Sequence, residues 1–197
     1  MSIPAIAAMK QRAKLRADKR RAKAKRLRAK LPYLTSDGRV LAVPPRWTLT
    51  TVGNKLREEL HAAIRERDGA VCISCGKTGL VVAFGGGTWQ AGHLFAVGPY
   101  RALRFHPLNI ASQCSQCNSG APRRGGRMGN HAAYAAAVIR RYGLATFAAL
   151  DAIKGLPQKW TRGGLIDLLD CLRRGGIDRY TARYFELTGW TVEEKAA

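Results

Sequence analysis

The sequence has 197 residues, 46% of them hydrophobic, and carries 34 Lys and Arg against 13 Asp and Glu, a formal net charge of +21. This length suits one compact domain of about 100 to 150 residues with extensions, and the apolar fraction excludes a chain that is disordered throughout. The charge favours nucleic acid as the partner. With no apolar run near the roughly 20 residues of a spanning helix and no secretory signal, we expect a cytoplasmic protein without a membrane partner.

The N-terminal stretch Lys10–Lys30 has Lys or Arg at nearly every second position, spaced by Ala and Leu. These residues favour helix, but repulsion between like charges predicts an arm that stays largely unfolded until phosphates neutralise it. Its function is either non-specific DNA binding or that of a solvated, solubilising tail. A linker, Leu31–Arg46, follows, in which three prolines break any continuing helix. Residues 1–46 are assigned to this basic arm and linker.

The central region, residues 47–143, is expected to form the core. An amphipathic helix is predicted over about Thr51–Arg67, with Asp68-Gly69 as its stop. Short apolar runs between Gly-rich turns then predict strands at Leu80–Phe84, Thr88–Ala91 and Ala102–Phe105. The stretch Ser119–Gly129 is rich in Gly and Arg, which predicts a mobile, phosphate-contacting loop.

The C-terminal part of the chain is predicted to be helical. Glycines end the first two helices, and Thr161 is a suitable N-cap for the third. The predicted ranges are His131–Tyr142, Ala145–Lys154, Arg162–Arg174 and Ile177–Leu187, the last ending at Gly189. Residues 144–197 are assigned to a C-terminal helical region, so the expected fold class is α+β. Cys171 lies on an apolar helix face, where a free Cys behaves as a small hydrophobe.

The other four cysteines form two Cys-x-x-Cys pairs, Cys72 with Cys75 and Cys114 with Cys117. Because disulfides are rare in the cytoplasm, metal binding is the first hypothesis for such pairs. Each spacing lets a tight turn point two thiolates at one ion. Together the pairs predict a Cys₄ site for Zn²⁺, which is structural because no coordination position is left for water or substrate. The alternative is four ordinary buried thiols.

A second set of polar residues lies around the cysteine pairs. His93 ends a predicted strand, Asn109 lies in the following loop, and Asn118 comes directly after Cys117. A His, a loop Asn and a polar residue beside the last zinc ligand, in this order, resemble the layout of an HNH nuclease. This resemblance implies a ββα-metal (HNH-like) core with a Cys₄ zinc knuckle.

Further short motifs extend the resemblance. They are Ile64-Arg-x-Arg-Asp68, Cys72-Ile-Ser-Cys75-Gly, Gly92-His93, Arg104-Phe105, Asn109, Gln113-Cys-x-x-Cys-Asn118, Gly129-Asn130 and Lys159-Trp-Thr161. The set, which covers roughly Leu56 to Thr161, resembles the NinG (Rap) recombination proteins of lambdoid phages. The resemblance implies metal-dependent, structure-specific cleavage of branched recombination DNA, of the Holliday junction or D-loop type, in the cytoplasm of the bacterial host.

The chemistry of phosphodiester hydrolysis assigns roles to these residues, since it needs a deprotonated water and a divalent ion. His93 suits the general base because the ordinary pKa of His lies near neutrality. Asn109 would orient its ring through a backbone or side-chain hydrogen bond. Asn118 would offer a carboxamide oxygen to Mg²⁺ or Mn²⁺, and Arg104 would clamp a phosphate oxygen.

Each assignment has a structural alternative. His93 can be a core histidine bonded to backbone, Asn109 a turn residue, and Asn118 a helix cap. Asn130 is expected as the N-cap of the helix that follows it, with a role as metal ligand left open.

The remaining histidines and Gly92 affect how complete the site is. His106 is expected to contact phosphate or face water, whereas His61 and His131 are taken as surface or packing residues. Many members of the wider HNH group carry an Asp metal ligand directly before the His, and here Gly92 occupies that place. The catalytic ion would then depend on Asn118, phosphate oxygens, waters and at most one further residue that the motif does not identify.

Two functions compete. The first is an endodeoxyribonuclease acting on branched DNA, with a symmetric homodimer as a reasonable assembly because resolving a four-way junction needs paired nicks. The second is a non-catalytic, zinc-containing recombination accessory protein that binds nucleic acid, for which charge and zinc would suffice. A ribosome-associated zinc protein is a third, suggested by the basic arm alone.

Overall fold

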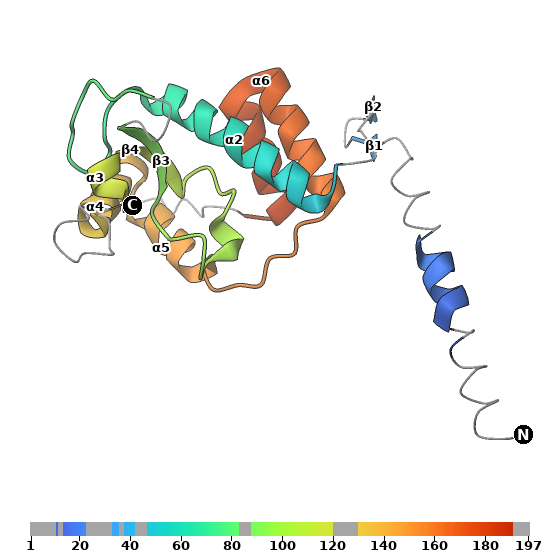
Figure 1. Cartoon of the computed structure of the whole chain (residues 1–197). Helices are drawn as coiled ribbons and strands as arrows, with labels where there is room; N and C mark the ends of the chain where they lie inside the picture. The colour runs from blue at the N-terminus through green and yellow to red at the C-terminus, as the bar shows by residue number, and fades with distance from the viewer. Residues whose placement is uncertain are drawn as a thin grey trace, which may run out of the picture. The chain divides into compact units, whose positions relative to one another are not determined.

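Figure 1 shows a computed structural model of the whole chain. It describes residues 11, 14–22, 33–35, 38–41, 47–82, 88–119 and 130–190. The chain forms two units, Met1–Thr51 and Val52–Ala197. No helix among the described residues is long and apolar enough to cross a membrane.

The first unit contains a helical segment and a small hairpin. Residues 14–22 of the basic arm are helical and exposed, in contrast to the predicted unfolded arm, because Ala, Lys and Arg have high helix propensity. Strands β1 (Tyr33–Leu34) and β2 (Val40–Leu41) pair antiparallel. The Thr35 N–H donates to the Arg39 carbonyl at 2.8 Å between them. The linker, expected only to break a helix, thus contains a two-stranded sheet.

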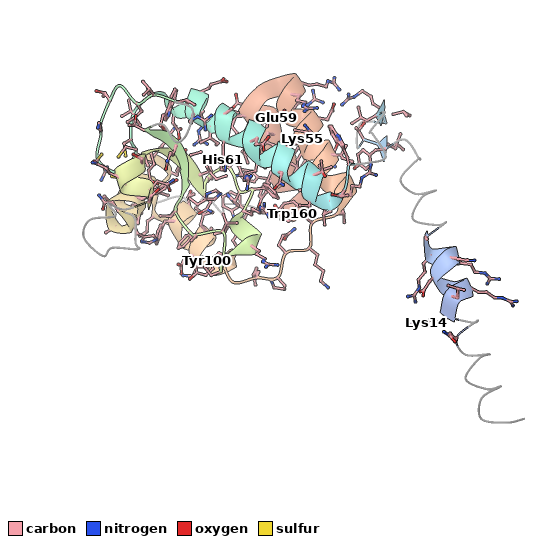
Figure 2. The ribbon with its side chains drawn as sticks, in the orientation of Figure 1. Lys14, Lys55, Glu59, His61, Tyr100 and Trp160 are labelled. Atoms are coloured by element: carbon pink, nitrogen blue, oxygen red, sulfur yellow. The ribbon has the colours of Figure 1, made fainter. Side chains whose placement is uncertain are left out.

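The second unit begins along α2 (Leu49–Asp68), which confirms the predicted amphipathic helix. Its buried positions follow one helical face: Val52, Gly53, Leu56, Leu60 and Ile64. This helix lies beside α6 (Arg162–Thr188), as Figure 1 shows. At the surface, Arg173 of α6 donates to the Glu59 carboxylate of α2 at 2.7 Å, on the side of α2 seen in Figure 2.

An antiparallel hairpin forms the centre of the unit. Strand β3 (Trp89–His93) pairs with β4 (Ile110–Cys114), in a register that runs from Trp89 opposite Cys114 to His93 opposite Ile110. The short helix α3 (Ser115–Ser119) follows β4 directly. The register therefore places the cysteine pairs at one end of the hairpin and His93 at the other.

The strand predictions were only partly correct. Of Leu80–Phe84, residues 80–82 are not in a strand and residues 83–84 lie outside the described residues. The predicted strand Ala102–Phe105 is wrong, because η1 (Arg101–Leu103) and a turn occupy it, with the Arg104 N–H bonded to the Arg101 carbonyl at 3.3 Å. The apolar side chains of this segment were expected to line a sheet, but they are buried within η1 and the turn that follows it. The loop predicted at Ser119–Gly129 lies outside the described residues beyond Ser119.

The C-terminal helices match the prediction closely. Helix α4 (His131–Tyr142) has the predicted bounds, and α5 (Leu144–Ile153) packs against it. Within α6, Gly175 and Gly176 leave helical geometry, with φ of +64° at Gly176, so the two predicted helices meet at a kink. The Thr161 hydroxyl accepts from the Gly164 N–H at 3.0 Å, which confirms the N-cap. Gly189 ends the helix with φ of +64°.

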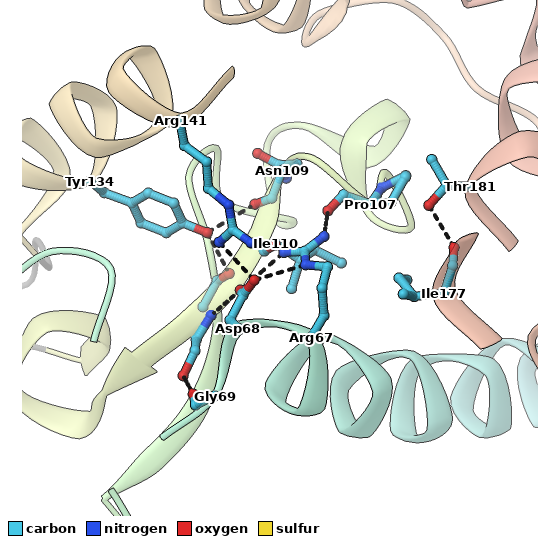
Figure 3. Close-up of polar contacts among 12 residues, drawn as sticks. Arg67, Asp68, Gly69, Pro107, Asn109, Ile110, Tyr134, Arg141, Ile177 and Thr181 are labelled. Carbon is cyan, nitrogen blue, oxygen red and sulfur yellow. Dashed lines mark hydrogen bonds and ion pairs between the residues drawn. The ribbon is translucent and has the colours of Figure 1, made fainter. Parts of the chain in front are cut away.

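A buried carboxylate joins α2, the hairpin and α4 (Figure 3). Asp68, whose side chain is 3% exposed, is ion-paired with Arg67 at 2.8 Å and Arg141 at 2.7 Å. It also accepts from the Ser112 N–H of β4 at 2.9 Å. Arg67 donates further to the carbonyls of Pro107 and Ile110. This network fixes the strand that carries the site residues.

His106 is part of the aromatic core, and the expectation that it would contact phosphate or face water is wrong. Its side chain is fully buried, with ring centroids 4.7 Å from Trp190 and 5.0 Å from Tyr184. Burial lowers its pKa to about 3, so the ring is neutral at physiological pH. The apolar surroundings of the Leu103–Leu108 turn explain this position.

Candidate functional site: a cysteine cluster and a histidine cavity

The two cysteine pairs meet in space. The sulfur atoms of Cys72, Cys75, Cys114 and Cys117 all lie within 4.8 Å of one another, and the Cys75 and Cys114 sulfurs are 3.8 Å apart. Four sulfurs at about 2.3 Å around a tetrahedral Zn²⁺ are separated by about 3.8 Å. The cluster is therefore positioned to bind a metal ion, and its donor set is compatible with structural zinc.

The backbone around the first pair forms the turn that this spacing requires. The Cys72 N–H donates to the Lys77 carbonyl and the Gly76 N–H donates to the Cys72 carbonyl, each at 2.9 Å. Burial raises the pKa of Cys72, but backbone N–H groups, that of Cys114 foremost, lower it to about 7. Burial and the neighbouring sulfurs raise the pKa of Cys117. Four thiols this close can ionise together only when a cation neutralises them.

His93 is the last residue of β3 and is half-buried. Its Nε2 lies 3.2 Å from the Arg104 carbonyl oxygen. Because a carbonyl only accepts, Nε2 carries the proton in this contact and Nδ1 remains the basic nitrogen. The ring also meets His61 of α2 edge-on, with centroids 5.5 Å apart, where α2 passes the hairpin (Figure 2).

The surroundings of His93 keep its ring neutral. Burial lowers its pKa first, the hydrogen bond to the Arg104 carbonyl raises it, and the charges of Arg104 and Arg57 lower it further, to about 4. The pKa of His61 is lowered to about 3, first by burial, then by His93 and by the charges of Arg57, Arg65 and Arg104. At neutral pH His93 is thus able to accept a proton, although as a weaker base than a free histidine.

His93 lines a cavity of about 610 Å³ between the hairpin, the loop after it, α4 and α5. Its polar lining includes His93, Gln113, Asn118, Asn130 and His131. Its aromatic lining includes Phe95, Tyr100 and Phe147, and Lys154 lies against the rings of Phe95 and Tyr100. A cavity of this size and mixed lining is typical of a site that takes a small molecule or one unit of a polymer.

Asn109 does not contact the His93 ring, contrary to the prediction. The side chain is fully buried and donates to the carbonyls of Phe95 and Leu103, each at 3.1 Å. It also accepts from the Phe95 N–H at 2.8 Å. These bonds fix both ends of the loop that leads to Arg104, so Asn109 positions His93 through the loop rather than directly.

Arg104 contributes its backbone to His93 and its side chain to a basic cluster. Burial lowers the pKa of Arg104, and the charges of Arg57 and Arg101 lower it further. Its Nε is buried without a hydrogen-bond partner in the part of the chain that the structure describes. Like charges gathered beside a half-buried histidine favour an anion as the missing partner.

Asn118 lies inside α3, one residue after the zinc-cluster Cys117, and lines the cavity. Its amide nitrogen donates to Gln90 of β3 at 2.7 Å. Asn118 is therefore not a helix cap. Asn130 occupies the N-cap position of α4 as predicted, but its side chain makes no capping hydrogen bond and lines the cavity instead.

Three residues near the site were missed from the sequence. Arg57 and His61 lie one helical turn apart on α2, and this spacing of four was the only sequence feature that could have paired them. Their approach to His93 depends on how α2 packs on the hairpin. Gln113 precedes Cys114 and carried no separate indication of function.

Comparisons with known proteins place the chain in a family. The pattern of the family described as Bacteriophage Lambda NinG protein matches residues 3–174. Protein ninG of Salmonella phage P22 is 33% identical over 128 residues, which is 62% of this chain and 53% of that protein. Protein ninG of Escherichia phage lambda is 33% identical over 108 residues, 53% of this chain and 45% of that protein. The chain thus spans about half the length of the curated relatives it matches.

No solved structure matches the chain significantly. The family match from residue 3 to residue 174 includes the cysteine cluster and every residue that lines the histidine cavity. On this ground the chain belongs to the NinG protein family.

Proposed function

We propose that this protein is an HNH-type endodeoxyribonuclease that hydrolyses phosphodiesters in branched recombination DNA of the Holliday junction or D-loop type. In this proposal β3, β4 and α3 form the ββα-metal core, and a zinc ion held by the four cysteines stabilises it. Paired nicks across a four-way junction need two such sites, so a homodimer is part of the proposal. The net charge of +21 supports DNA as the partner.

One observation carries the proposal. The His93 ring is held at Nε2 by the Arg104 carbonyl, which leaves Nδ1 as the base, and it lines the same cavity as the Asn118 carboxamide. A neutral imidazole beside an oxygen donor suits proton removal from a water that attacks phosphorus. Arg57 and Arg104 supply positive charge for the phosphate, and Asn109 holds the loop that carries Arg104.

The donor chemistry of the cavity fits a hard divalent ion. Its candidate ligands are carboxamide oxygens, which Mg²⁺ and Mn²⁺ accept. The cavity holds one carboxylate, Asp151, which is ion-paired with Lys154. A bound Mg²⁺ or Mn²⁺ would neutralise charge on the scissile phosphate. Such a site relies on the DNA phosphate for part of its affinity.

The test is the His93→Ala variant of the zinc-loaded full chain on a synthetic four-way junction with Mg²⁺ or Mn²⁺. We expect cleavage to fall by about 10²- to 10⁴-fold, the usual contribution of a general base. Zinc content and DNA affinity should match the wild type, since His93 holds neither the cysteines nor most of the phosphates. Thermal melting of both proteins controls for folding.

The opposite result favours the accessory function. A zinc-loaded wild type that binds junctions but cuts no branched DNA with either ion would exclude the nuclease. Cleavage that persists unchanged in His93→Ala would assign the base to another residue.

A further inference from the structure

Gly92 is required for space rather than for backbone geometry, because its φ is not positive. A Cβ atom at this position would lie 1.9 Å from Gln113 Oε1 and 2.9 Å from Asn118 Oδ1. No side chain fits there without displacing the amide of Gln113. Two carboxamide oxygens, one from β4 and one from α3, therefore converge on the space that a side chain at position 92 would take.

Hydrogen bonds orient the two amides. Gln113 Nε2 donates to the Ser74 hydroxyl at 2.8 Å and to the Cys117 carbonyl at 3.4 Å. Because a carbonyl oxygen can only accept, the end of the Gln113 amide that faces Cys117 is its NH₂ group. Asn118 Nδ2 donates to Gln90 Oε1 at 2.7 Å. The NH₂ groups are thus engaged, and the oxygens of Gln113 and Asn118 are turned towards Gly92.

Neither oxygen receives a hydrogen bond from any residue within the described ranges. Gln113 is 2% exposed, and both side chains line the cavity that holds His93. His93 lines the same cavity, and its Nδ1 is the ring nitrogen that the Arg104 carbonyl does not engage. Neither amide oxygen is among the fully buried polar atoms that lack a partner, so both reach the cavity, where a cation or ordered water can bond to them.

We infer that Gln113 supplies the oxygen ligand that position 92 lacks, so that Gln113 Oε1 and Asn118 Oδ1 together hold the divalent cation of this cavity. The inference rests on the proposed function, which requires that cation. Two neutral oxygens form a weak site by themselves. Binding of Mg²⁺ or Mn²⁺ is therefore coupled to DNA, whose phosphate adds the negative charge.

The test measures Mn²⁺ binding by electron paramagnetic resonance, in the zinc-loaded full chain carrying His93→Ala so that bound junction DNA stays intact. In this background Gln113→Ala should weaken Mn²⁺ binding at least about 10-fold, a loss of about 1.4 kcal/mol. Gln116→Ala is the matched control, since Gln116 is an exposed glutamine on α3 that does not line the cavity. It should bind Mn²⁺ as the parent does.

Two further variants keep the inference testable if Gln113→Ala disturbs the zinc turn through Ser74. Gln113→Glu keeps the shape and adds a charge, while the Ser74 hydroxyl can donate to the carboxylate, so Mn²⁺ should bind more tightly without DNA. The double variant Gly92→Asp with Gln113→Ala places a carboxylate in the vacated space and should restore binding. Gly92→Asp alone should melt at a lower temperature, because its Cβ meets the Gln113 oxygen.

Mn²⁺ binding equal to that of Gln116→Ala in all three Gln113 variants would overturn the inference. The result is separable from the fate of the nuclease proposal. Binding that depends on Gln113 in a protein that never cuts DNA would support the inference and refute the nuclease. Cleavage by wild type, together with Mn²⁺ binding that does not depend on Gln113, would support the nuclease and refute the inference.

Discussion

The two ends of the β3–β4 hairpin offer contrasting ligand sets. At one end four identical thiols lie within 4.8 Å of one another and close a site completely. His93 at the other end lines an open cavity of about 610 Å³, whose two carboxamides, Gln113 and Asn118, are sequence neighbours of Cys114 and Cys117. A closed set of strong ligands stabilises the fold, whereas an open set of neutral ones leaves positions for substrate and water. The cysteine cluster and the proposed catalytic site thus use neighbouring but different side chains.

The largest effect should come from the closed end. Cys114→Ala removes one of four ligands, and metal binding in such sites contributes on the order of 10 kcal/mol to folding. We expect the variant to lose its zinc and its cooperative thermal transition, as measured by metal analysis and circular dichroism. Cys171→Ala is the control, since Cys171 is buried in α6 outside the cluster and should keep full zinc. A zinc-replete, normally melting Cys114→Ala would refute the role of the cluster.

The next effect tests the link between the two ends. Asp68 is bonded to Ser112, in the middle of β4, and Asp68→Asn should cost about 3 kcal/mol of unfolding free energy because two arginines lose their partner. Urea unfolding of this variant, with the exposed Glu66→Gln as control, measures the loss. An Asp68→Asn protein as stable as the control would show that the network is dispensable.

The same carboxylate predicts a pH dependence. Burial raises the pKa of Asp68, but hydrogen bonding and charge from Arg67 outweigh it, so the pKa lies below its ordinary value. Its contribution to stability is complete above the ordinary Asp pKa of about 3.9 and is lost as the pH falls towards the folded value. The difference in unfolding free energy between wild type and Asp68→Asn should therefore shrink below about pH 4. A difference that stays constant into that range would contradict the assignment.

A smaller effect concerns affinity outside the cavity. Deleting residues 1–31 removes the basic arm and should lower both DNA affinity and its salt dependence, by a slope of about 0.9 for each phosphate that the arm neutralises. Filter binding to a junction over a series of salt concentrations measures the slope. An unchanged slope would indicate that the arm is a solubilising tail and does not bind DNA.

The smallest effect concerns the base itself. Arg57→Gln removes a positive charge that lowers the pKa of His93, so that pKa should rise slightly from about 4. Proton NMR titration of the ring gives the His93 pKa. The acid side of the pH profile of the cleavage rate should move to higher pH with it. Arg140→Gln removes the same charge from α4 and should leave the His93 pKa unchanged. Equal shifts in both variants would exclude a local effect of Arg57.

The sequence predicted what depends on local spacing. The helix His131–Tyr142 and the caps at Thr161 and Gly189 were correct, because periodicity and capping act within one element. Each Cys-x-x-Cys pair is likewise a local turn. Strand β4 was missed because all five of its residues are buried, including the polar Ser112 and Gln113, so no alternation marks it.

The parts of the site that depend on tertiary packing were not predictable. Asn109 was expected to bond the His93 ring, but it holds the loop at Phe95 and Leu103, a pairing set by how that loop closes. The basic partner Arg57 approaches His93 only because α2 packs across the hairpin. Gly92 pairs with Ala111, and Gln113 lies two residues further along β4, from where its side-chain oxygen reaches the space beside Gly92. No spacing within the sequence encodes these contacts.

The most direct measurement is the crystal structure of zinc-loaded His93→Ala bound to junction DNA in Mn²⁺, with anomalous maps at the zinc and manganese edges. Zinc should appear among the four cysteine sulfurs, and manganese beside the Asn118 oxygen and a DNA phosphate within the histidine cavity. Manganese found only elsewhere, or DNA bound with the cavity turned away from its backbone, would contradict the assignment of this cavity as a nuclease site.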